Sequence, residues 1–135
     1  MSVAAVGYLR IGAQDNSAWM DFGTAVLGLM EAPRQDDQGA RFLRMDNHPF
    51  RLMVEQSDTD ALLATGLEYR SHQEWQAACE SLAAAGFSVQ SGPASDAARR
   101  AVTAYATVQD PSGNTLELYY GRLLDYAPLI SPTGV

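Results

Sequence analysis

One carboxylate, Glu117, lies inside a segment that otherwise has the pattern of a core strand, DPSGNTLELYYG. Its neighbours are Leu116 and Leu118, and because strand side chains alternate between faces, Glu117 points away from both leucines. An inward carboxylate requires a metal ion, a cationic partner or a proton, since an unpaired charge is costly to bury. The local residues leave two interpretations equal: an inward ligand, or a residue that faces solvent at a sheet edge.

The other groups capable of chemistry do not form a recognisable site with Glu117. His48 is predicted to be a polar turn residue in DNHPF, and His72 a surface residue in the first turn of a helix. Neither histidine has the spacing of a local metal motif. Cys79 is interpreted as an inert core thiol, and Arg99 and Arg100 as a solvated pair in a mobile loop. The sequence contains no glycine-rich phosphate loop and no nucleophile elbow.

Three tyrosines on predicted strands, Tyr8, Tyr69 and Tyr119, could line a pocket for a small aromatic ligand. Ordinary strand packing is the alternative interpretation, and the residues favour it, because aromatic side chains are common on half-buried strands. A pocket lined by these tyrosines is therefore the less favoured of the two interpretations.

Composition narrows the class of protein. The chain has 135 residues, 47% of them hydrophobic and 19% charged, which is typical of one folded domain. A net charge of −7 argues against nucleic acid and anionic membranes as partners. A single cysteine excludes an internal disulfide, and with no signal peptide or long apolar segment in the pattern, we predict a cytoplasmic protein.

The hydrophobic pattern repeats once along the chain. Residues 3–13 predict a strand, residues 17–29 a helix with one apolar face, and "ARFLRMD" with "FRLMVEQ" a hairpin. The order then restarts with a strand over 61–71 and a helix through about Ala85 that begins at a Ser71–Glu74 capping box. Trp19 and Trp75 occupy matching helix positions, and Asp46 and Asp110 precede matching turns.

This repeat predicts an α+β fold of two βαβββ modules, about residues 3–57 and 61–121. Neither module can bury a sheet face alone, so we expect one cup-shaped domain over residues 1–121 with the helices outside. Residues 122–135 (RLLDYAPLISPTGV) are predicted to be a tail or an interdomain linker. Alternate strand residues would then point into the cup, which suits a small ligand.

Four segments, in order, resemble the N-terminal domain of type I extradiol ring-cleavage dioxygenases, most of all the 2,3-dihydroxybiphenyl 1,2-dioxygenases. These enzymes belong to the vicinal oxygen chelate superfamily, with glyoxalase I and the bleomycin-resistance proteins. The resemblance covers nearly the whole chain, and it is carried by VGYLRIGAQDNSAWMDFGTAVLGL, ARFLRMDNHPFRLMV, DPSGNTLELYYG and PLISPTGV.

The resemblance implies an iron site that this chain only partly retains. Family enzymes hold Fe(II) with two histidines and one glutamate, which leaves positions for a catecholate and dioxygen. The ligand positions fall on Tyr8, near Ala64 and on Glu117, so one of three ligands matches. We therefore expect no cofactor in this chain, and water, a nearby arginine or a raised pKa to accommodate Glu117.

The implied function is that of the non-metal half that supports fold and assembly of an Fe(II) ring-cleavage enzyme of aromatic degradation. A homo-oligomer and a second, catalytic domain are the expected partners, and catalysis by this chain alone is not expected. A stand-alone small-molecule binding protein of the same superfamily is the alternative. A metal site assembled across a dimer ranks last, because it requires two histidines at the cup.

Overall fold

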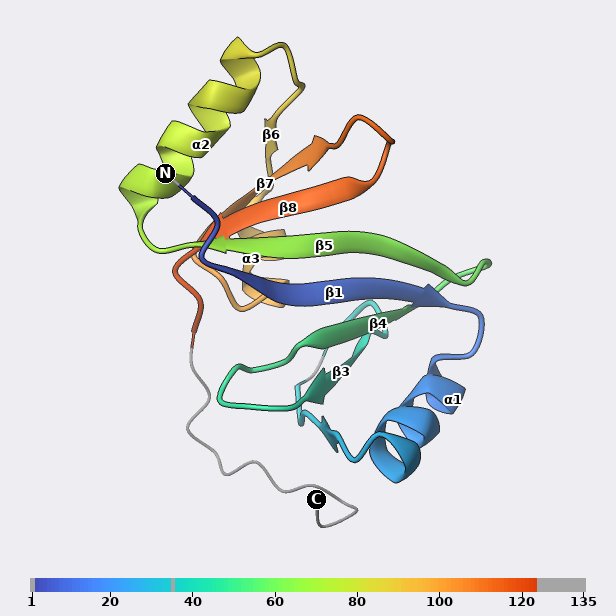
Figure 1. Ribbon diagram of the computed structural model, residues 1–135. Coiled ribbons are helices and arrows are strands. Elements are labelled where there is room, and N and C mark those ends of the chain that lie inside the picture. The colour runs from blue at the N-terminus through green and yellow to red at the C-terminus, as the bar shows by residue number, and fades with distance from the viewer. Residues whose placement is uncertain (1, 35, 124–135) are drawn as a thin grey trace. The chain divides into compact units, whose positions relative to one another are not determined.

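The computed structural model describes residues 2–34 and 36–123, and these divide into two compact units (Figure 1). We call Tyr8–Leu63 the first unit, and residues 2–7 with 64–123 the second unit. Of the predicted tail or linker over 122–135, residues 124–135 lie outside the described part of the chain. None of the helices in the described part is both long and apolar enough to cross a membrane.

The first unit contains four neighbouring strands of the eight-stranded sheet, in the order β2-β3-β4-β1. Strands β1 and β4 are parallel, whereas β2–β3 and β3–β4 are antiparallel. Its elements in chain order are β1 (Ala5–Ala13, which begins in the second unit), α1 (Asn16–Asp21), the π-helical segment η1 (Phe22–Val26), β2 (Met30–Glu31), β3 (Arg41–Arg44) and β4 (Leu52–Gln56).

The second unit repeats this arrangement with the strand order β5-β8-β7-β6. Strands β5 and β8 are parallel, and the other two pairings are antiparallel. Its elements are β5 (Ala61–Tyr69, which begins in the first unit), α2 (His72–Ala84), β6 (Gln90–Ser91), α3 (Ala94–Arg99), β7 (Ala104–Gln109) and β8 (Thr115–Tyr120). The predicted α+β class and the two βαβββ modules are confirmed.

Two details of the prediction are wrong. The segment PASDAARR (residues 93–100), in which Arg99 and Arg100 were expected to lie in a loop, forms the helix α3 over Ala94–Arg99. The first predicted helix is regular only over Asn16–Asp21 and continues as η1, in which the Leu27 N–H donates to the Phe22 carbonyl. Gly28 follows at a φ of 75°, a left-handed conformation that suits glycine and ends the helix.

Side-chain caps and turns repeat between the units as the sequence predicts. Asp15 accepts the backbone N–H of Ala18 at the start of α1, and Ser71 accepts that of Glu74 at the start of α2. In the β3–β4 connection the Asp46 carboxylate accepts the N–H of residue 48 (3.0 Å), and in the β7–β8 turn the Asp110 carboxylate accepts that of residue 112 (2.9 Å). Both aspartates thus order a turn through the residue two positions later.

Each unit packs its helix over its own sheet. The core of the first unit is formed by Ala13, Met20, Leu43 and Val54. In the second unit the core is formed by Tyr69, Ala78, Val108 and Leu118, and Trp75 of α2 packs against it. The Trp75 indole also donates to the Leu118 carbonyl at 2.7 Å, which ties α2 to β8.

Candidate functional site

Glu117 lies on β8 with its side chain inside the protein. It is 1% exposed, and its position in the sheet is opposite Gly66 of β5 and Thr107 of β7. The flanking Leu118 packs on the other face, in the core under α2. Of the two interpretations that the local residues left equal, the inward one is therefore correct.

The partner of Glu117 is Arg100, at the C-terminal end of α3. The Arg100 Nε donates to Glu117 Oε1 at 2.6 Å, and Nη2 donates to Oε2 at 3.0 Å. The guanidinium also donates to the Asp96 carbonyl at 2.9 Å and lies 4.2 Å from the centre of the Tyr105 ring. A bidentate pair of this kind neutralises both charges in a buried site. Of the three expected ways to accommodate Glu117, which were water, a nearby arginine or a raised pKa, the structure shows the arginine.

The prediction that Arg100 is solvated in a loop is wrong, since it is 5% exposed. The error has a physical cause: PASDAARR contains few large apolar residues, so its pattern favours a loop. The short helix α3 is held by one buried alanine, Ala97, and by the arginine that follows it. The doublet of arginines was a signal, but only the fold shows which of the two enters the interior.

The three positions implied for the iron ligands do not fit an iron site. Ala64 is buried and has no ligand atom, and Tyr8, in the other unit, is buried with its ring 5.7 Å from that of Phe50. Both oxygens of Glu117 accept hydrogen bonds from the guanidinium. Within residues 2–34 and 36–123, no three His, Cys, Asp or Glu side chains form a group that could hold a metal ion.

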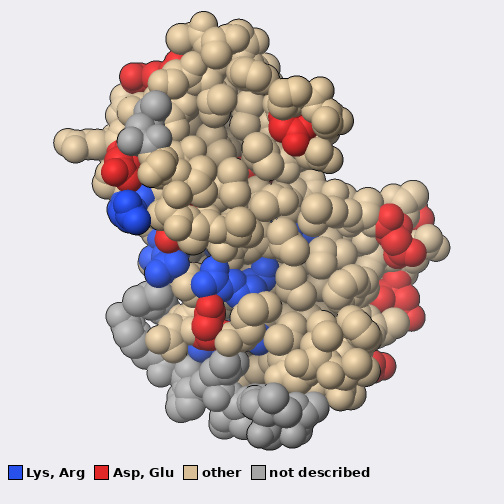
Figure 2. Space-filling view, viewed as in Figure 1, with Lys and Arg blue, Asp and Glu red and all other residues tan. Residues whose placement is uncertain are grey.

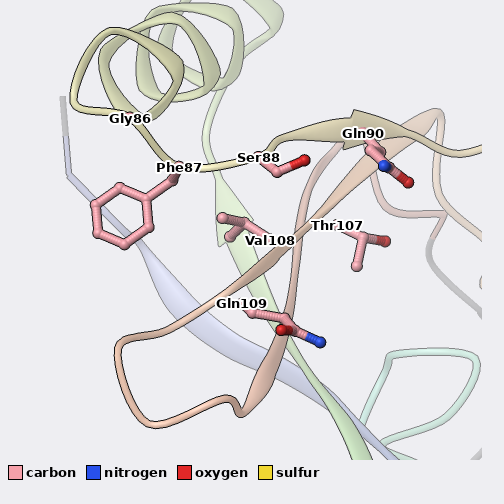
Figure 3. Close-up of a pocket in the computed structure, with 7 residues that line it drawn as sticks. All are labelled: Gly86, Phe87, Ser88, Gln90, Thr107, Val108 and Gln109. Carbon is pink, nitrogen blue, oxygen red and sulfur yellow. The ribbon is translucent and has the colours of Figure 1, made fainter.

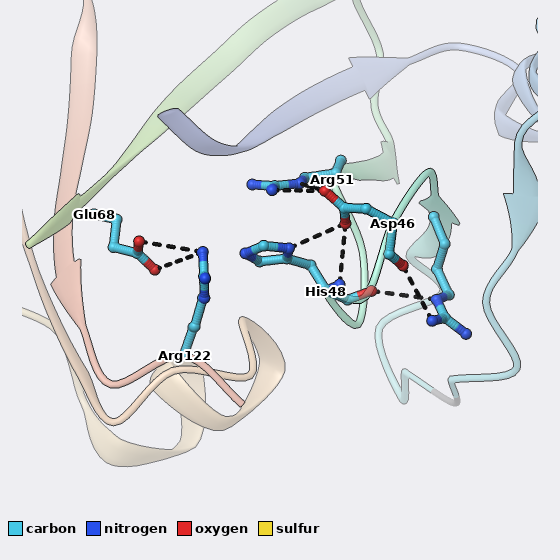
Figure 4. A network of polar contacts seen from close by, with 6 residues as sticks. Asp46, His48, Arg51, Glu68 and Arg122 are labelled. Atoms are coloured by element: carbon cyan, nitrogen blue, oxygen red, sulfur yellow. Dashed lines mark hydrogen bonds and ion pairs between the residues drawn. The ribbon is translucent and has the colours of Figure 1, made fainter. Parts of the chain in front are cut away.

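His48 belongs to a polar network in the connection between β3 and β4 (Figure 4). Its Nδ1 lies 3.0 Å from Asp46 Oδ1, and Arg51 donates to the other oxygen of Asp46 at 2.7 and 2.9 Å. Burial raises the pKa of Asp46, but the Arg51 hydrogen bond, the His48 backbone N–H and the charges of both residues hold that pKa below 3.8. The prediction of a polar turn is confirmed. Arg44, which is 0% exposed, donates hydrogen bonds to the backbone carbonyls of Asp46 and His48 in this turn.

The remaining reactive groups serve packing. His72 is exposed at the start of α2, as predicted, and its ring lies 5.2 Å from that of Tyr120. Cys79 is half-buried, and burial, with a smaller contribution from Glu80, raises the pKa of its thiol. A thiol with a raised pKa is a poor nucleophile near neutral pH. Of the predicted tyrosines, Tyr119 is 2% exposed, and its hydroxyl fills the space beside Gly7.

Two hollows lie on the second unit. One, of about 550 Å³, includes Tyr69 together with Glu68 and Arg122, which form an ion pair of 3.1 Å (Figure 4). The other is a groove of about 400 Å³ between the end of α2 and the β6–β7 edge, and its lining residues include Phe87, Ser88, Gln90 and Gln109 (Figure 3). Glu117 and Tyr119 line neither hollow.

Comparison with known proteins agrees with the resemblance. Residues 6–56 match the family described as dihydroxybiphenyl dioxygenase BphC D1. The chain is 39% identical over 134 residues to an iron-dependent extradiol dioxygenase of Rhodococcus jostii (strain RHA1), across 99% of this chain and 44% of that protein. It is 38% identical over 121 residues to a biphenyl-2,3-diol 1,2-dioxygenase of Paraburkholderia xenovorans (strain LB400), across 90% of this chain and 40% of that protein.

Comparison of the fold with solved structures points to the same family. A crystal structure of a catechol 2,3-dioxygenase superposes with a TM-score of 0.90 at 27% identity, covering 98% of this chain and 46% of that one. A halotolerant catechol dioxygenase also gives a TM-score of 0.90, at 25% identity. The chain spans less than half the length of these relatives. Its order of strands, its fold and its sequence agree, and the chain is a domain of the extradiol dioxygenase family.

Proposed function

We propose that this chain is the non-metal half of an Fe(II) ring-cleavage enzyme, and that it supports the fold and assembly of a second, catalytic half. One observation carries the proposal: the carboxylate at the implied ligand position is neutralised by Arg100 on both oxygens. A guanidinium already occupies the face of the carboxylate that a metal ion would require. The length of the relatives supports a second half, since this chain matches 44% of the Rhodococcus jostii protein.

The substrate of the complete enzyme would be a catechol-like aromatic compound, to be opened next to its two hydroxyl groups by dioxygen. Support comes from the names of the relatives, which include a 3-methylcatechol 2,3-dioxygenase and two 1,2-dihydroxynaphthalene dioxygenases. The iron of the other half would bind both substrates, whereas this half contributes packing. We extend the proposal to a homo-oligomer in the cytoplasm.

The test compares the chain with a chimera. In the chimera, residues 1–135 of this chain replace the matching part of the Rhodococcus jostii relative. The two sequences are 39% identical over that part. Both proteins are loaded with Fe(II) under anaerobic conditions, desalted, analysed for iron, and mixed with 2,3-dihydroxybiphenyl in air. We expect about one iron per chimera with formation of the yellow ring-fission product, and neither for the chain alone.

Two controls separate folding from chemistry. Circular dichroism of the isolated chain shows whether it is folded when it lacks iron. A double substitution in the chimera, Arg100→Met with Glu117→Leu, removes the ion pair and should leave the iron content unchanged. Stoichiometric iron and robust ring cleavage by the isolated chain would contradict the proposal. The alternative, a stand-alone binding protein, would be favoured by two results together: the isolated chain binds a small ligand without iron, and the chimera has no ring-cleavage activity.

A further inference from the structure

The larger of the two hollows on the second unit, of about 550 Å³, lies where β5 and β8 end. Its charged lining residues are Glu68, Arg70 and Arg122, and its lining also includes Ala4 and Ala5. The sequence contains nine arginines and no lysine, so every cationic side chain is a guanidinium. Figure 2 shows arginine atoms at the surface near this end of the two strands, which Figure 1 locates. The hollow thus brings together two of the nine guanidinium groups.

Hydrogen bonds fix the backbone around the hollow. On one side the Ala4 N–H donates to the Glu68 carbonyl at 2.7 Å. Directly before Arg122, the Gly121 carbonyl accepts the Thr103 hydroxyl at 2.9 Å. Gly121 has a φ of 71°, a left-handed conformation that suits glycine and turns the chain at the end of β8. The hollow is therefore preformed, and a ligand that enters it needs little rearrangement of the backbone.

The three charges of the hollow are unequally neutralised. The Arg122 Nη1 lies 3.2 and 3.1 Å from the two carboxylate oxygens of Glu68 (Figure 4). Among the described residues, no hydrogen-bond or ion-pair partner is present for the Nε and Nη2 of Arg122, nor for the exposed guanidinium of Arg70. Two arginines and one glutamate leave a net charge of +1, and the available donors belong to both arginines.

We propose that this hollow binds the carboxylate of a small organic acid. A guanidinium presents parallel N–H donors that match the two oxygens of a carboxylate, and Arg70 has this fork available. The available donors of Arg122 lie at the same hollow, and Ala4 and Ala5 provide contacts for the hydrocarbon part of the acid. A net charge of +1 suits a ligand with one negative charge. The Glu68 carboxylate repels a second negative charge, such as that of a phosphate dianion.

Exposure limits the affinity of this site. The side chain of Arg122 is 35% exposed, and an ion pair open to water contributes little. The chain also carries a net charge of −7, which repels anions at long range. For benzoate, an acid that is ionised near neutral pH, we expect a dissociation constant on the order of 1 mM.

Titration of the nitrogen-labelled chain with benzoate, followed by two-dimensional amide NMR spectra, measures this dissociation constant. The amide signals of Ala4, Ala5 and Gly121 should shift and saturate. Benzamide has the same shape without the charge, and should shift them little. Inorganic phosphate should bind more weakly than benzoate, because Glu68 opposes its second charge.

Two substitutions test the role of charge in opposite directions. Arg70→Gln removes the available fork and should raise the dissociation constant for benzoate by about fivefold or more. Glu68→Gln leaves two positive charges in the hollow, so it should lower that constant by about threefold or more and allow phosphate to bind. Arg41→Gln is the matched control, since it removes a partly exposed arginine that pairs with Glu31 in the first unit. It should leave the dissociation constant unchanged.

Circular dichroism and thermal unfolding should show that each variant folds like the wild type, because all the substituted side chains lie at the surface or in hollows open to it. The absence of saturable shifts with benzoate up to about 50 mM would overturn the proposal. So would equal binding of benzamide, tighter binding of phosphate than of benzoate by the wild type, or an unchanged dissociation constant in Arg70→Gln. These measurements require neither iron nor ring cleavage, so the proposed function and the carboxylate site can fail separately.

Discussion

The two units share one order of elements but satisfy the donors of a buried guanidinium in different ways. In the first unit Arg44 is fully buried and donates to the carbonyls of Asp46 and His48, within four residues along the chain. In the second unit Arg100 forms a bidentate pair with Glu117, 17 residues away on another element. The local bonds are to neutral carbonyls, whereas the distant pair joins two charges that neither partner can bury alone.

The helices of the two units also differ in how they are held. Trp19 and Trp75 hold matching positions in the sequence. Four residues later the first helix has Gly23, in η1, whereas α2 has Cys79. Gly23 lets the first helix lie close to Leu43, while Trp75 anchors the second helix through a hydrogen bond to β8. One helix is held by close approach and the other by a polar contact, so different substitutions should release them.

The largest expected effect comes from Arg100→Ala. It leaves the buried Glu117 carboxylate without its cation, which should lower the free energy of unfolding by about 3–5 kcal/mol. Arg44→Ala removes the hydrogen bonds to the carbonyls of Asp46 and His48, and should cost about 1–3 kcal/mol. Urea unfolding of both variants measures the difference. The double variant Arg100→Met with Glu117→Leu should recover most of the loss, and equal losses for the two single variants would refute the distinction between the units.

Gly23→Ala tests close approach in the first unit. A Cβ there would lie 2.5 Å from Leu43 Cδ1, and Leu43 is fully buried, so the core must shift. We expect a loss of about 1–3 kcal/mol from overpacking. At the matching position, Cys79→Ala only trims a half-buried side chain and should cost about 1 kcal/mol or less. Thermal and urea unfolding compare the two, and a larger loss for Cys79→Ala would contradict this account of α1.

Trp75→Phe tests the polar anchor of the second helix. The substitution keeps an aromatic ring but removes the donor to the Leu118 carbonyl, which is 2.7 Å away. In the first unit, Trp19 packs against the core and lies edge-on to Phe22 at 6.0 Å. Trp75→Phe should therefore destabilise by about 0.5–1.5 kcal/mol more than Trp19→Phe. Measured losses in the reverse order would show that the hydrogen bond is not what fastens α2.

The smallest expected effect is on acid stability. Hydrogen bonds from the Asn114 side chain and from backbone N–H groups lower the pKa of Asp110, and the pKa of Asp46 is also lowered. A carboxylate with a lowered pKa in the folded state stabilises above its unfolded pKa of 3.8, and this stability is lost as pH falls through the folded value. The urea concentration at the midpoint of unfolding should fall as the pH is lowered from near neutral to about 3. This fall should be smaller in Asp46→Asn and in Asp110→Asn than in the wild type. If stability falls equally with pH in both variants and in the wild type, these two turns are not the source of the loss of stability in acid.

Much of the architecture could be predicted because it depends on local periodicity. The capping serine Ser71 and the turn aspartates each act within a few residues of their own position, and the two tryptophans repeat at matching helix positions, so the letters reveal them. The segment PASDAARR could not be assigned in this way. Its helix is held by Ala97 and Arg100, and a polar string with one buried alanine has the same local pattern whether it folds or stays a loop.

The sequence by itself determined the repeat, the α+β class, the resemblance to the extradiol dioxygenases and the fact that Glu117 points away from its neighbouring leucines. Strand alternation, helix period and resemblance are all properties of the linear pattern. Only the tertiary structure decided that Arg100 is the partner of Glu117 and that Arg122 lines one hollow with Glu68 and Arg70. Both depend on which distant elements pack together, because the energy of a charged group is set by its surroundings and not by its neighbours in the chain.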